Sequence, residues 1–405
     1  MKDIKVCVIG LGGRGKSLLE ETILKQGEHV TALCDPWIEK AEAAAESVVN
    51  AGGERPAVYT DYMDALKDEN VNTVVIASGW STHIEIAIEA MKHHKITAME
   101  VSGAYSVDEC YRLVDAYEKT KTPFMFMENC CYGRRELMAL HMAEMGIFGK
   151  IVHCAGGYQH DLRGELSKGK RTHHYRLLDY LGRNCENYPT HELGPIARIL
   201  KINRGNKMLS LTAMSSSAAG LHEYIMQHEN DDEQLVNACF AQGDIVTTVI
   251  KCANGETITL TLDTTLPRYY SRNFTVRGTK GMYEEVTDSV FLDREEDRKL
   301  EGSWRRTNVG NAEKYAEEYE HPLWKEFRKE NIEGTHGGMD WLEFKDFFRC
   351  IREGRSMPIN VYDAASWMVI TALTEESIAK GGAPVYIPDF TKGKWQSGML
   401  DGIEI

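Results

Sequence analysis

The fold is decided by Lys5-Val6-Cys7-Val8-Ile9-Gly10-Leu11-Gly12-Gly13-Arg14-Gly15, an apolar strand pattern that runs directly into a glycine-rich turn. A helical pattern follows, and a second apolar run, Val30-Thr31-Ala32-Leu33-Cys34, ends in Asp35. Strand, glycine turn, helix, strand and acid, in this order, predict a dinucleotide-binding unit. The alternative that the residues leave open is an ordinary tight turn between a strand and a helix.

Each part of this unit has an expected task. Gly10 makes the tight turn, Gly12 and its neighbour Gly13 let the backbone approach a pyrophosphate, and Gly15 lets the helix and the strand pack closely. The helix N-terminus offers free N–H groups and a positive dipole end to the phosphates. Asp35 is placed to bond the adenosine ribose, which favours NAD over NADP because a 2′-phosphate would meet its charge. Arg14 is the nearby cation that would soften this preference.

The bulk composition indicates a soluble, globular protein of two or three domains. The chain has 405 residues, 42% of them hydrophobic and 27% charged. A net charge of −14 argues against a nucleic-acid partner. There is no apolar run of about 18 residues and no signal-peptide pattern, so we expect no membrane partner and a cytoplasmic location. The ten cysteines include no C-x-x-C pair, which favours buried thiols over disulfides or a zinc site.

The patterning changes near residue 150. Before it, strand and helix patterns alternate, which predicts an NAD-binding Rossmann domain with a doubly wound parallel sheet over residues 1–130. After it, alternating strands and the hairpin signal Asn254-Gly255 predict an α+β domain with a mostly antiparallel open sheet over residues 131–405. We expect strands in this second domain over residues 209–213, 235–240, 245–252, 257–262 and 274–278, an irregular surface segment over 294–334, and helices over 340–352 and 362–380.

Polar and aromatic residues follow several strands of the first domain. In doubly wound sheets, ligands bind outside the carboxyl ends of the strands. The candidates for a cofactor groove are therefore the residues at these ends. Each of them, taken alone, is more often a cap of the next helix than a ligand, and Ser81 and Thr82 could simply cap the helix that they begin. Polar or aromatic residues at four strand ends together favour a cofactor groove. The candidates are Trp80, His83, Glu100 and Asn129.

The most informative part of the second domain is the stretch 156–195. It concentrates His, Tyr and Arg, the side chains of proton transfer and anion binding. A second interpretation is a metal site, although the spacings match no regular ligand motif and we expect no metal. A third is that Tyr158 and Arg176 merely pack against the sheet and bond each other. The residues that would form the metal site are His160, Asp161, His173, His174 and His191.

The whole chain resembles the Gfo/Idh/MocA oxidoreductases, which have a Rossmann domain and an open sheet that forms dimers and carries the sugar site. Where that family has Glu-Lys-Pro, this chain has Glu100-Val101-Ser102. Its motifs instead resemble glycoside hydrolase family 109, the NAD-dependent α-N-acetylgalactosaminidases. The matching motifs are Trp80-Ser81-Thr82-His83, Glu100-Val101, Glu128-Asn129-Cys130-Cys131-Tyr132-Gly133, Gly157-Tyr158-Gln159-His160-Asp161-Leu162-Arg163, Tyr188-Pro189-Thr190-His191, Tyr269-Tyr270-Ser271-Arg272 and His336-Gly337-Gly338-Met339-Asp340.

The resemblance implies two sets of ligand-binding residues and a homodimer or higher homo-oligomer. The glycine turn, Asp35, Trp80 to His83, Glu100, Val101 and Asn129 would bind NAD. The substrate would be a small-molecule glycoside. Its sugar would be bound by Tyr158, Arg176, Tyr188, Pro189, Thr190, His191 and Tyr270.

Hydrolysis by this family would differ from the usual use of two flanking carboxylates. NAD⁺ would oxidise sugar C3, after which C2 deprotonation, elimination, hydration and reduction complete a redox-neutral cycle. We expect His191 to take the C3 hydroxyl proton and Tyr158 the C2 proton, with Arg176 lowering the phenol pKa. Glu128 would orient His191 or the nicotinamide ribose. The alternatives are an NAD-dependent sugar 3-dehydrogenase of the same fold and a non-catalytic NAD-binding sensor.

Overall fold

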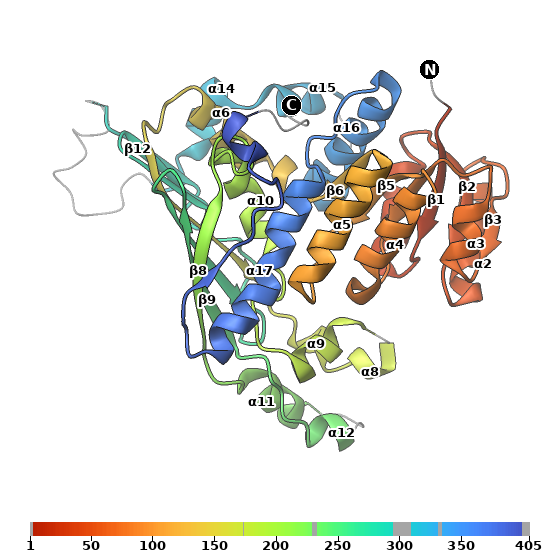
Figure 1. Cartoon of the computed structure of the whole chain (residues 1–405), viewed down its shortest axis with the longest axis horizontal. Coiled ribbons are helices and arrows are strands. Elements are labelled where there is room, and N and C mark those ends of the chain that lie inside the picture. Colours follow the sequence, from red (N-terminus) through yellow and green to blue (C-terminus); the bar gives the residue numbers. More distant parts are fainter. Residues whose placement is uncertain (1–2, 173, 229–232, 295–308, 331–333, 399–405) are drawn as a thin grey trace.

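The structure is a computed structural model that describes residues 3–172, 174–228, 233–294, 309–330 and 334–398. Two β-sheets lie at opposite ends of the molecule, and helices fill the space between them (Figure 1). Among the described helices, none has the length and the apolar character that crossing a membrane requires. His173, one of the residues of the alternative metal site, lies outside the described residues.

The first sheet has six parallel strands in the order β3-β2-β1-β4-β5-β6. Strands β1, β4 and β6 are mostly apolar and almost wholly buried because helices cover both faces, and this confirms the predicted doubly wound fold. β1 lies between β2 and β4, so the strand order reverses beside β1, whose carboxyl end leads into the glycine turn. The strands are β1 (Lys5–Ile9), β2 (His29–Cys34), β3 (Ala57–Tyr59), β4 (Thr73–Ile76), β5 (Ile96–Glu100) and β6 (Phe124–Met127).

Two helices of this part begin at polar caps that the sequence predicts. Asp61 accepts a hydrogen bond from the Met63 N–H, and Ser106 and Glu109 form a reciprocal capping box. These caps fix the helix starts, and thereby the direction in which each strand end opens. The helices are α1 (Gly13–Leu18), continued by the π-helical turn η1 (Leu19–Ile23), α2 (Ile38–Asn50), α3 (Tyr62–Lys67), α4 (Trp80–Lys92) and α5 (Val107–Thr120).

The second sheet has eight strands in the order β13-β12-β11-β7-β10-β9-β8-β14. All neighbours are antiparallel except β7 and β10, which confirms a mostly antiparallel open sheet. The Asn254-Gly255 hairpin joins β9 and β10 as predicted, with Gly255 at a φ of +104°. The strands are β7 (Ile151–Gln159), β8 (Met208–Ser215), β9 (Ile245–Cys252), β10 (Thr257–Asp263), β11 (Thr275–Gly278), β12 (Gly281–Glu284), β13 (Ser289–Leu292) and β14 (Val385–Tyr386).

Two predictions in the second domain are wrong. The segment 235–240 is not a strand: Leu235 lies in the short helix α12 (Glu233–Val236), which contacts α11 (Gly220–Gln227) instead of joining the sheet. The segment 294–334 is not irregular throughout, because α14 (Ala312–Tyr319) and α15 (Pro322–Glu330) occupy much of its described part. Both helices bury aromatic side chains, so packing overrides their charge-rich composition.

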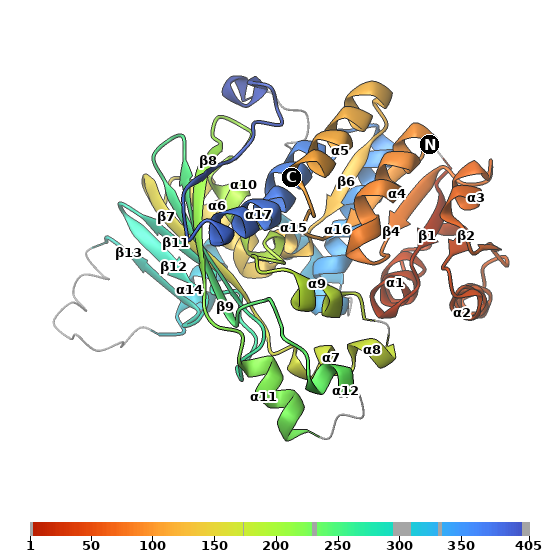
Figure 2. The same cartoon turned by 60° about the horizontal axis from the view of Figure 1, so that its bottom comes forward.

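The last two long helices return to the first sheet. α16 (Met339–Glu353) contacts η1 and the 3₁₀ turn η2 (Asn129–Tyr132). α17 (Val361–Ala379) contacts α5 and β6 on one side and β8 and α10 (Thr190–Ile199) on the other (Figure 1). The two sheets are therefore joined through a continuous helical layer. Figure 2 shows three short helices below this layer, α7 (Arg163–Leu166), α8 (Gly169–Thr172) and α9 (Arg176–Gly182). The remaining elements are α6 (Arg134–Glu144), η3 (Thr335–Gly338) and η4 (Lys394–Ser397).

Candidate active site

The glycine turn after β1 has the geometry of a phosphate-binding turn. Gly10 has a φ of +92°, and a Cβ there would lie 2.5 Å from the Ser78 nitrogen. A Cβ on Gly15 would lie 1.9 Å from the Gly10 oxygen, so the expected close packing at both positions is confirmed. At Gly12 and Gly13, by contrast, no heavy atom lies within 4 Å of the added Cβ. The first N–H groups of α1 are thus left open to an anion.

Asp35 fixes the shape of this turn. Its Oδ2 accepts a hydrogen bond of 2.7 Å from the Leu11 N–H, and its Oδ1 accepts one of 2.9 Å from the Trp37 N–H. The carboxylate therefore ties the end of β2 to the glycine turn. Each oxygen has a second lone pair for another donor, so ribose binding by Asp35 stays a prediction.

Arg14 is held by two carboxylates from distant parts of the chain. Its guanidinium donates to both oxygens of Asp340 at 2.7 and 2.9 Å and to Glu100 at 2.8 Å. Asp340 also accepts hydrogen bonds from the Asn129 side-chain amide and the Thr335 hydroxyl. Arg14 is thus engaged inside the protein rather than placed to receive a 2′-phosphate. This arrangement agrees with the preference for NAD that Asp35 predicts.

The start of α4 divides its four candidate residues into two groups. Ser81 and Thr82 are exposed, and the Thr82 hydroxyl donates to the Gly79 carbonyl at 2.8 Å. The N-cap of α4 is Gly79 and no side chain caps it, so the capping alternative is wrong for these two residues. His83 is buried with its Nε2 2.8 Å from the Ser78 carbonyl oxygen. Burial lowers the pKa of His83 to about 4, so this ring is neutral at pH 7. Trp80 points instead into the second domain.

Trp80 forms one wall of an aromatic cage around Arg176. Its ring stacks on Tyr188 with the centroids 5.0 Å apart and contacts Tyr175 at the same distance. The Arg176 guanidinium carbon lies 5.0 Å from the Trp80 ring and 5.1 Å from the Tyr188 ring. The cage restrains the guanidinium by cation–π contacts and gives it a fixed position. It also joins the cofactor domain to the stretch 156–195 identified from sequence.

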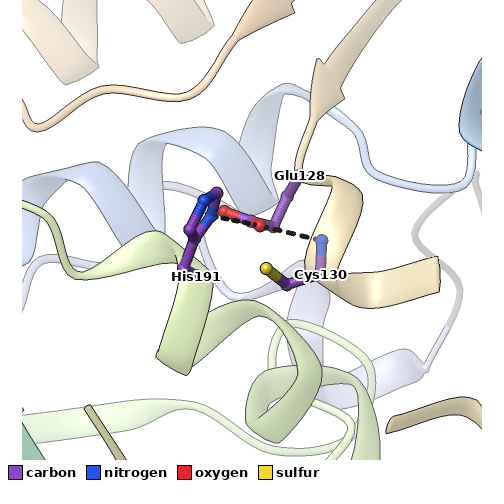
Figure 3. Close-up of side chains that lie close together, drawn as sticks. All are labelled: Glu128, Cys130 and His191. Atoms are coloured by element: carbon purple, nitrogen blue, oxygen red, sulfur yellow. Dashed lines mark hydrogen bonds and ion pairs between the residues drawn. The ribbon is translucent and has the colours of Figure 1, made fainter. Parts of the chain in front are cut away.

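Glu128 and His191 form a buried dyad beside this cage. Glu128 follows β6, and its Oε1 lies 2.7 Å from His191 Nδ1 and 3.1 Å from the Cys130 N–H (Figure 3). Burial opposes ionisation of Glu128, but His191 holds its pKa below the usual range. Because a carboxylate only accepts, Nδ1 carries the proton, and the Nε2 lone pair lies 3.3 Å from the Tyr188 hydroxyl.

Tyr158, at the end of β7, lies next to this dyad. Its ring centroid is 5.7 Å from that of His191, and its hydroxyl is 3.2 Å from His160 Nδ1. Burial raises the pKa of Tyr158, and the Arg176 guanidinium opposes this effect without overcoming it. The expectation of a lowered phenol pKa is therefore wrong for this structure, because removal from water outweighs the cation. The half-exposed ring of Tyr270 lies 6.5 Å from that of Tyr158.

The remaining candidates have separate places. Val101 is buried and its N–H donates to Glu100, while Pro189 and Thr190 begin α10 directly before His191. The four described members of the alternative metal site do not bring their ligand atoms together as one group. Asp161 binds Arg163, His174 binds Glu165, His160 contacts Tyr158, and His191 binds Glu128.

Family comparisons agree with this geometry. Residues 4–127 match the model of the oxidoreductase family with an NAD-binding Rossmann fold, and residues 132–397 match the model of the glycosyl hydrolase 109 C-terminal domain. The chain belongs to glycosyl hydrolase family 109. Its family 109 relatives include an α-N-acetylgalactosaminidase of Tannerella forsythia, 36% identical over 96% of this chain and 86% of that protein. Another, from Solibacter usitatus, is 35% identical over 97% of this chain and 90% of that protein.

Solved structures share the fold of this family 109 member. A levoglucosan dehydrogenase in complex with NADH and levoglucosan superposes with a TM-score of 0.68 at 20% identity, covering 96% of this chain and 100% of that one. A myo-inositol dehydrogenase from Lactobacillus casei gives a TM-score of 0.62 at 17% identity, covering 96% and 99%. The Rossmann domain of this family 109 enzyme is NAD-binding.

Sequence reasoning missed two parts of the site. Asp340 is one, because nothing in the sequence relates it to Arg14, 326 residues away. Cys130 is the other: it directly follows the predicted residues Glu128 and Asn129, but a single cysteine carries no signal by itself. Its place beside Glu128 and His191 follows from the η2 turn after β6.

Proposed function

We propose that this family 109 enzyme hydrolyses α-N-acetylgalactosaminides or closely related glycosides by a redox-neutral route through C3. The observation that carries the proposal is the Glu128–His191 dyad, which presents an imidazole base beside the Tyr158 phenol. The sugar class is taken from the relative in Tannerella forsythia. The NAD-binding domain supplies the reason for a redox route.

Acidic side chains of the stretch 156–195 do not offer a usual glycosidase pair. Asp161 is paired with Arg163, and Glu165 with His174. The other described acids of the stretch, Asp179, Glu186 and Glu192, are buried. Hydrolysis by two carboxylates needs one acid and one base or nucleophile on either side of the glycosidic bond. Proton transfer by His191 and Tyr158 fits the residues better.

NAD fits the open turn at Gly12 and Gly13, and we expect Asp35, Trp80, Glu100 and Asn129 to complete its site. When bound, NAD⁺ supplies a hydride acceptor for sugar C3 and holds that hydride for the return step. The protein contributes the rest: the glycine turn places the cofactor, and the aromatic cage around Arg176 places the sugar beside it. Tyr188, Pro189, Thr190 and Tyr270 would line the same sugar site.

His191 is the proposed base for the C3 hydroxyl. Its Nδ1 proton is held by Glu128, so its Nε2 lone pair is available to accept a proton as C3 becomes a ketone. The positive charge that forms on the ring is stabilised by the buried Glu128 carboxylate. His191 returns the proton when C3 becomes an alcohol again. Glu128 is therefore a positioning residue that acts through His191.

Tyr158 is the proposed base for the C2 proton. A C3 ketone acidifies the C2–H bond, and loss of that proton lets the anomeric C–O bond break by elimination. Water then adds at C1, and the proton returns to C2. Ionisation of the buried phenol is supported by the Arg176 guanidinium, 5.8 Å from the ring, and by His160, whose Nδ1 can accept the phenol proton.

We also propose that the enzyme is a homodimer built on the outer face of the second sheet. The inner face is covered by α10 and α17. The outer face exposes apolar side chains from several strands, more than a solvent-facing sheet usually carries. These side chains are Val152, Leu209, Met214, Val249, Phe291 and Tyr386.

Purified protein with NAD⁺ should release the aglycone from an aryl α-N-acetylgalactosaminide without accumulating NADH. His191→Ala should lower turnover at least about 100-fold, the usual contribution of a general base, while NAD binding is unchanged. Turnover is followed by aglycone absorbance and NAD binding by calorimetry. Near-normal turnover of the variant would remove His191 from the mechanism. NADH formed in proportion to substrate would identify a sugar dehydrogenase instead.

A further inference from the structure

We propose that Glu128, Cys130 and His191 form a binding site for a thiophilic divalent cation such as Zn²⁺, and that the bound ion inhibits the enzyme. This site differs from the metal site considered from sequence, which shares only His191 with it. The inhibitory consequence rests on the proposed function of His191. The binding itself does not.

Three ligand atoms of different chemistry converge at this point. Among the described residues, one group of His, Cys, Asp and Glu side chains brings its ligand atoms within 4.8 Å of one another, and it consists of Glu128, Cys130 and His191. In Figure 3 the Cys130 sulfur lies on the side of the η2 turn that faces His191, below the Glu128 carboxylate. The three come from two separate segments, the η2 turn and the start of α10.

Glu128 has an unused ligand atom. Its side chain is fully buried, and Oε1 serves both His191 and the Cys130 N–H, whereas Oε2 has no partner at hydrogen-bond distance. The Thr190 hydroxyl beside the carboxylate helps to lower the Glu128 pKa but makes no close hydrogen bond itself. A buried carboxylate oxygen without a partner is costly, and a cation would satisfy it. The Cys130 thiol is likewise buried, and it donates to the Asn129 side-chain oxygen at 3.5 Å, an ordinary length for a weak sulfur donor.

The donor set matches the ligand preferences of zinc. Carboxylate oxygen, thiolate sulfur and imidazole nitrogen all bind Zn²⁺, and three protein ligands with one open position are the usual set of a reactive zinc site. Bonds of about 2.0–2.3 Å require the three atoms to approach one another slightly. One carboxylate and one thiolate neutralise the charge of the ion. Burial raises the pKa of the Cys130 thiol, and the Arg272 guanidinium, itself paired with Glu136, only partly opposes this, so the thiolate forms as the ion binds.

A cation at this point would block the proposed base. His191 faces the cluster with Nδ1, the atom that carries the proton donated to Glu128. An ion bound to Nδ1 displaces that proton, and a neutral ring then carries its proton on Nε2. Nε2 has no lone pair left for the C3 hydroxyl. The thiol proton of Cys130 leaves to solvent as the sulfur binds the ion.

Cys131 provides a matched control. It is the next residue in the chain and is equally buried, but it is not a member of the cluster. Its sulfur lies instead toward α10 at Gly194, where an added Cβ would come within 3.0 Å of it. Substitution of either cysteine removes one buried thiol from the same turn. Only Cys130 should matter for the cation.

The test is a titration of the NAD-loaded enzyme with Zn²⁺ and with Cd²⁺. We expect both ions to abolish turnover and EDTA to restore it, and Cd²⁺ to produce the ultraviolet charge-transfer band of a cadmium thiolate. Cys130→Ser, which keeps the size of the side chain, should lose the band and, relative to its own metal-free turnover, require at least about tenfold more metal for inhibition. Cys131→Ser should respond like the unsubstituted enzyme.

Two results would overturn the proposal. One is the absence of a cadmium–thiolate band in the unsubstituted enzyme. The other is equal metal sensitivity of Cys130→Ser and Cys131→Ser. If Cd²⁺ binds through Cys130 but no glycoside is cleaved in any condition, the metal site stands and the proposed function fails, because the spectroscopic readout is independent of turnover.

Discussion

The phenol of Tyr158 is subject to two opposing effects. Burial among aromatic rings raises its pKa, while the Arg176 guanidinium lowers it. The caged position of Arg176 therefore has a catalytic consequence, because it limits the cost of ionising the proposed C2 base. Sequence reasoning identified both residues but could not weigh burial against charge.

Replacing Arg176 by Met should slow C2 proton exchange at neutral pH by about tenfold for each unit by which the Tyr158 pKa rises. The direction of the pH effect follows from the role of Tyr158 as a base. Because a base must be deprotonated to act, a higher Tyr158 pKa moves the rising limb of the pH–rate profile to higher pH. The measurement is the rate of deuterium incorporation at C2 as a function of pH. A profile that keeps its position, with only a weaker KM, would restrict Arg176 to sugar binding.

At the scale of elements, the contact between the glycine turn and α16 joins the two ends of the chain. Arg14 leads α1, Asp340 lies in the first turn of α16, and Asn129 of η2 completes the network. This contact holds α16 against the glycine turn. The two carboxylates that pair with Arg14 are both buried, so loss of either leaves an imbalance of charge in the interior.

Asp340→Asn should lower the free energy of unfolding by about 3 kcal/mol, because one partner of a buried ion pair is lost. Asp64→Asn, which removes the exposed pair with Lys67, is the control and should change it by less than about 0.5 kcal/mol. Denaturant titration measures both. A similar small effect of the two substitutions would show that α16 is held by apolar packing alone.

The Arg14–Asp340 ion pair also predicts that the stability of the protein depends on pH. Arg14 and His336 hold the pKa of Asp340 below its usual range despite burial. The stabilisation is then fully present above the unfolded pKa of about 3.9 and is lost as the pH falls toward the folded value. The difference in stability between the unsubstituted protein and Asp340→Asn should stay constant from pH 7 to 5 and shrink below about pH 4. A constant difference at pH 3 would contradict this assignment.

The elements that the sequence predicted best are those with local signals. Asp61, Ser106 and Asn254-Gly255 start or join elements at the expected positions because their own side chains or backbone make the decisive bonds. The segment 235–240 failed because an apolar run fits a buried helix turn as well as a strand. The Arg14–Asp340 pair and the Glu128–Cys130–His191 cluster depend on contacts between distant segments, which no spacing reveals.

At the scale of the whole molecule, the open sheet leaves one face apolar and exposed. If this face forms the dimer, Met214→Lys combined with Val249→Lys should produce monomers, since both side chains lie on adjacent strands of that face. Light scattering after size exclusion gives the mass. The double variant should retain NAD binding, because the cofactor turn lies at the opposite end of the molecule (Figure 1). A dimer of unchanged mass would move the interface elsewhere.

The central claim is that the NAD-binding domain and the second domain share one site, where the sugar is oxidised and reduced again within one turnover. It is tested most directly by hydrolysis of an aryl α-N-acetylgalactosaminide in deuterated water with NAD⁺ present. The account predicts product sugar with deuterium at C2, the C3 hydrogen of the substrate retained, and no accumulation of NADH. Product that carries no deuterium at C2 would contradict it.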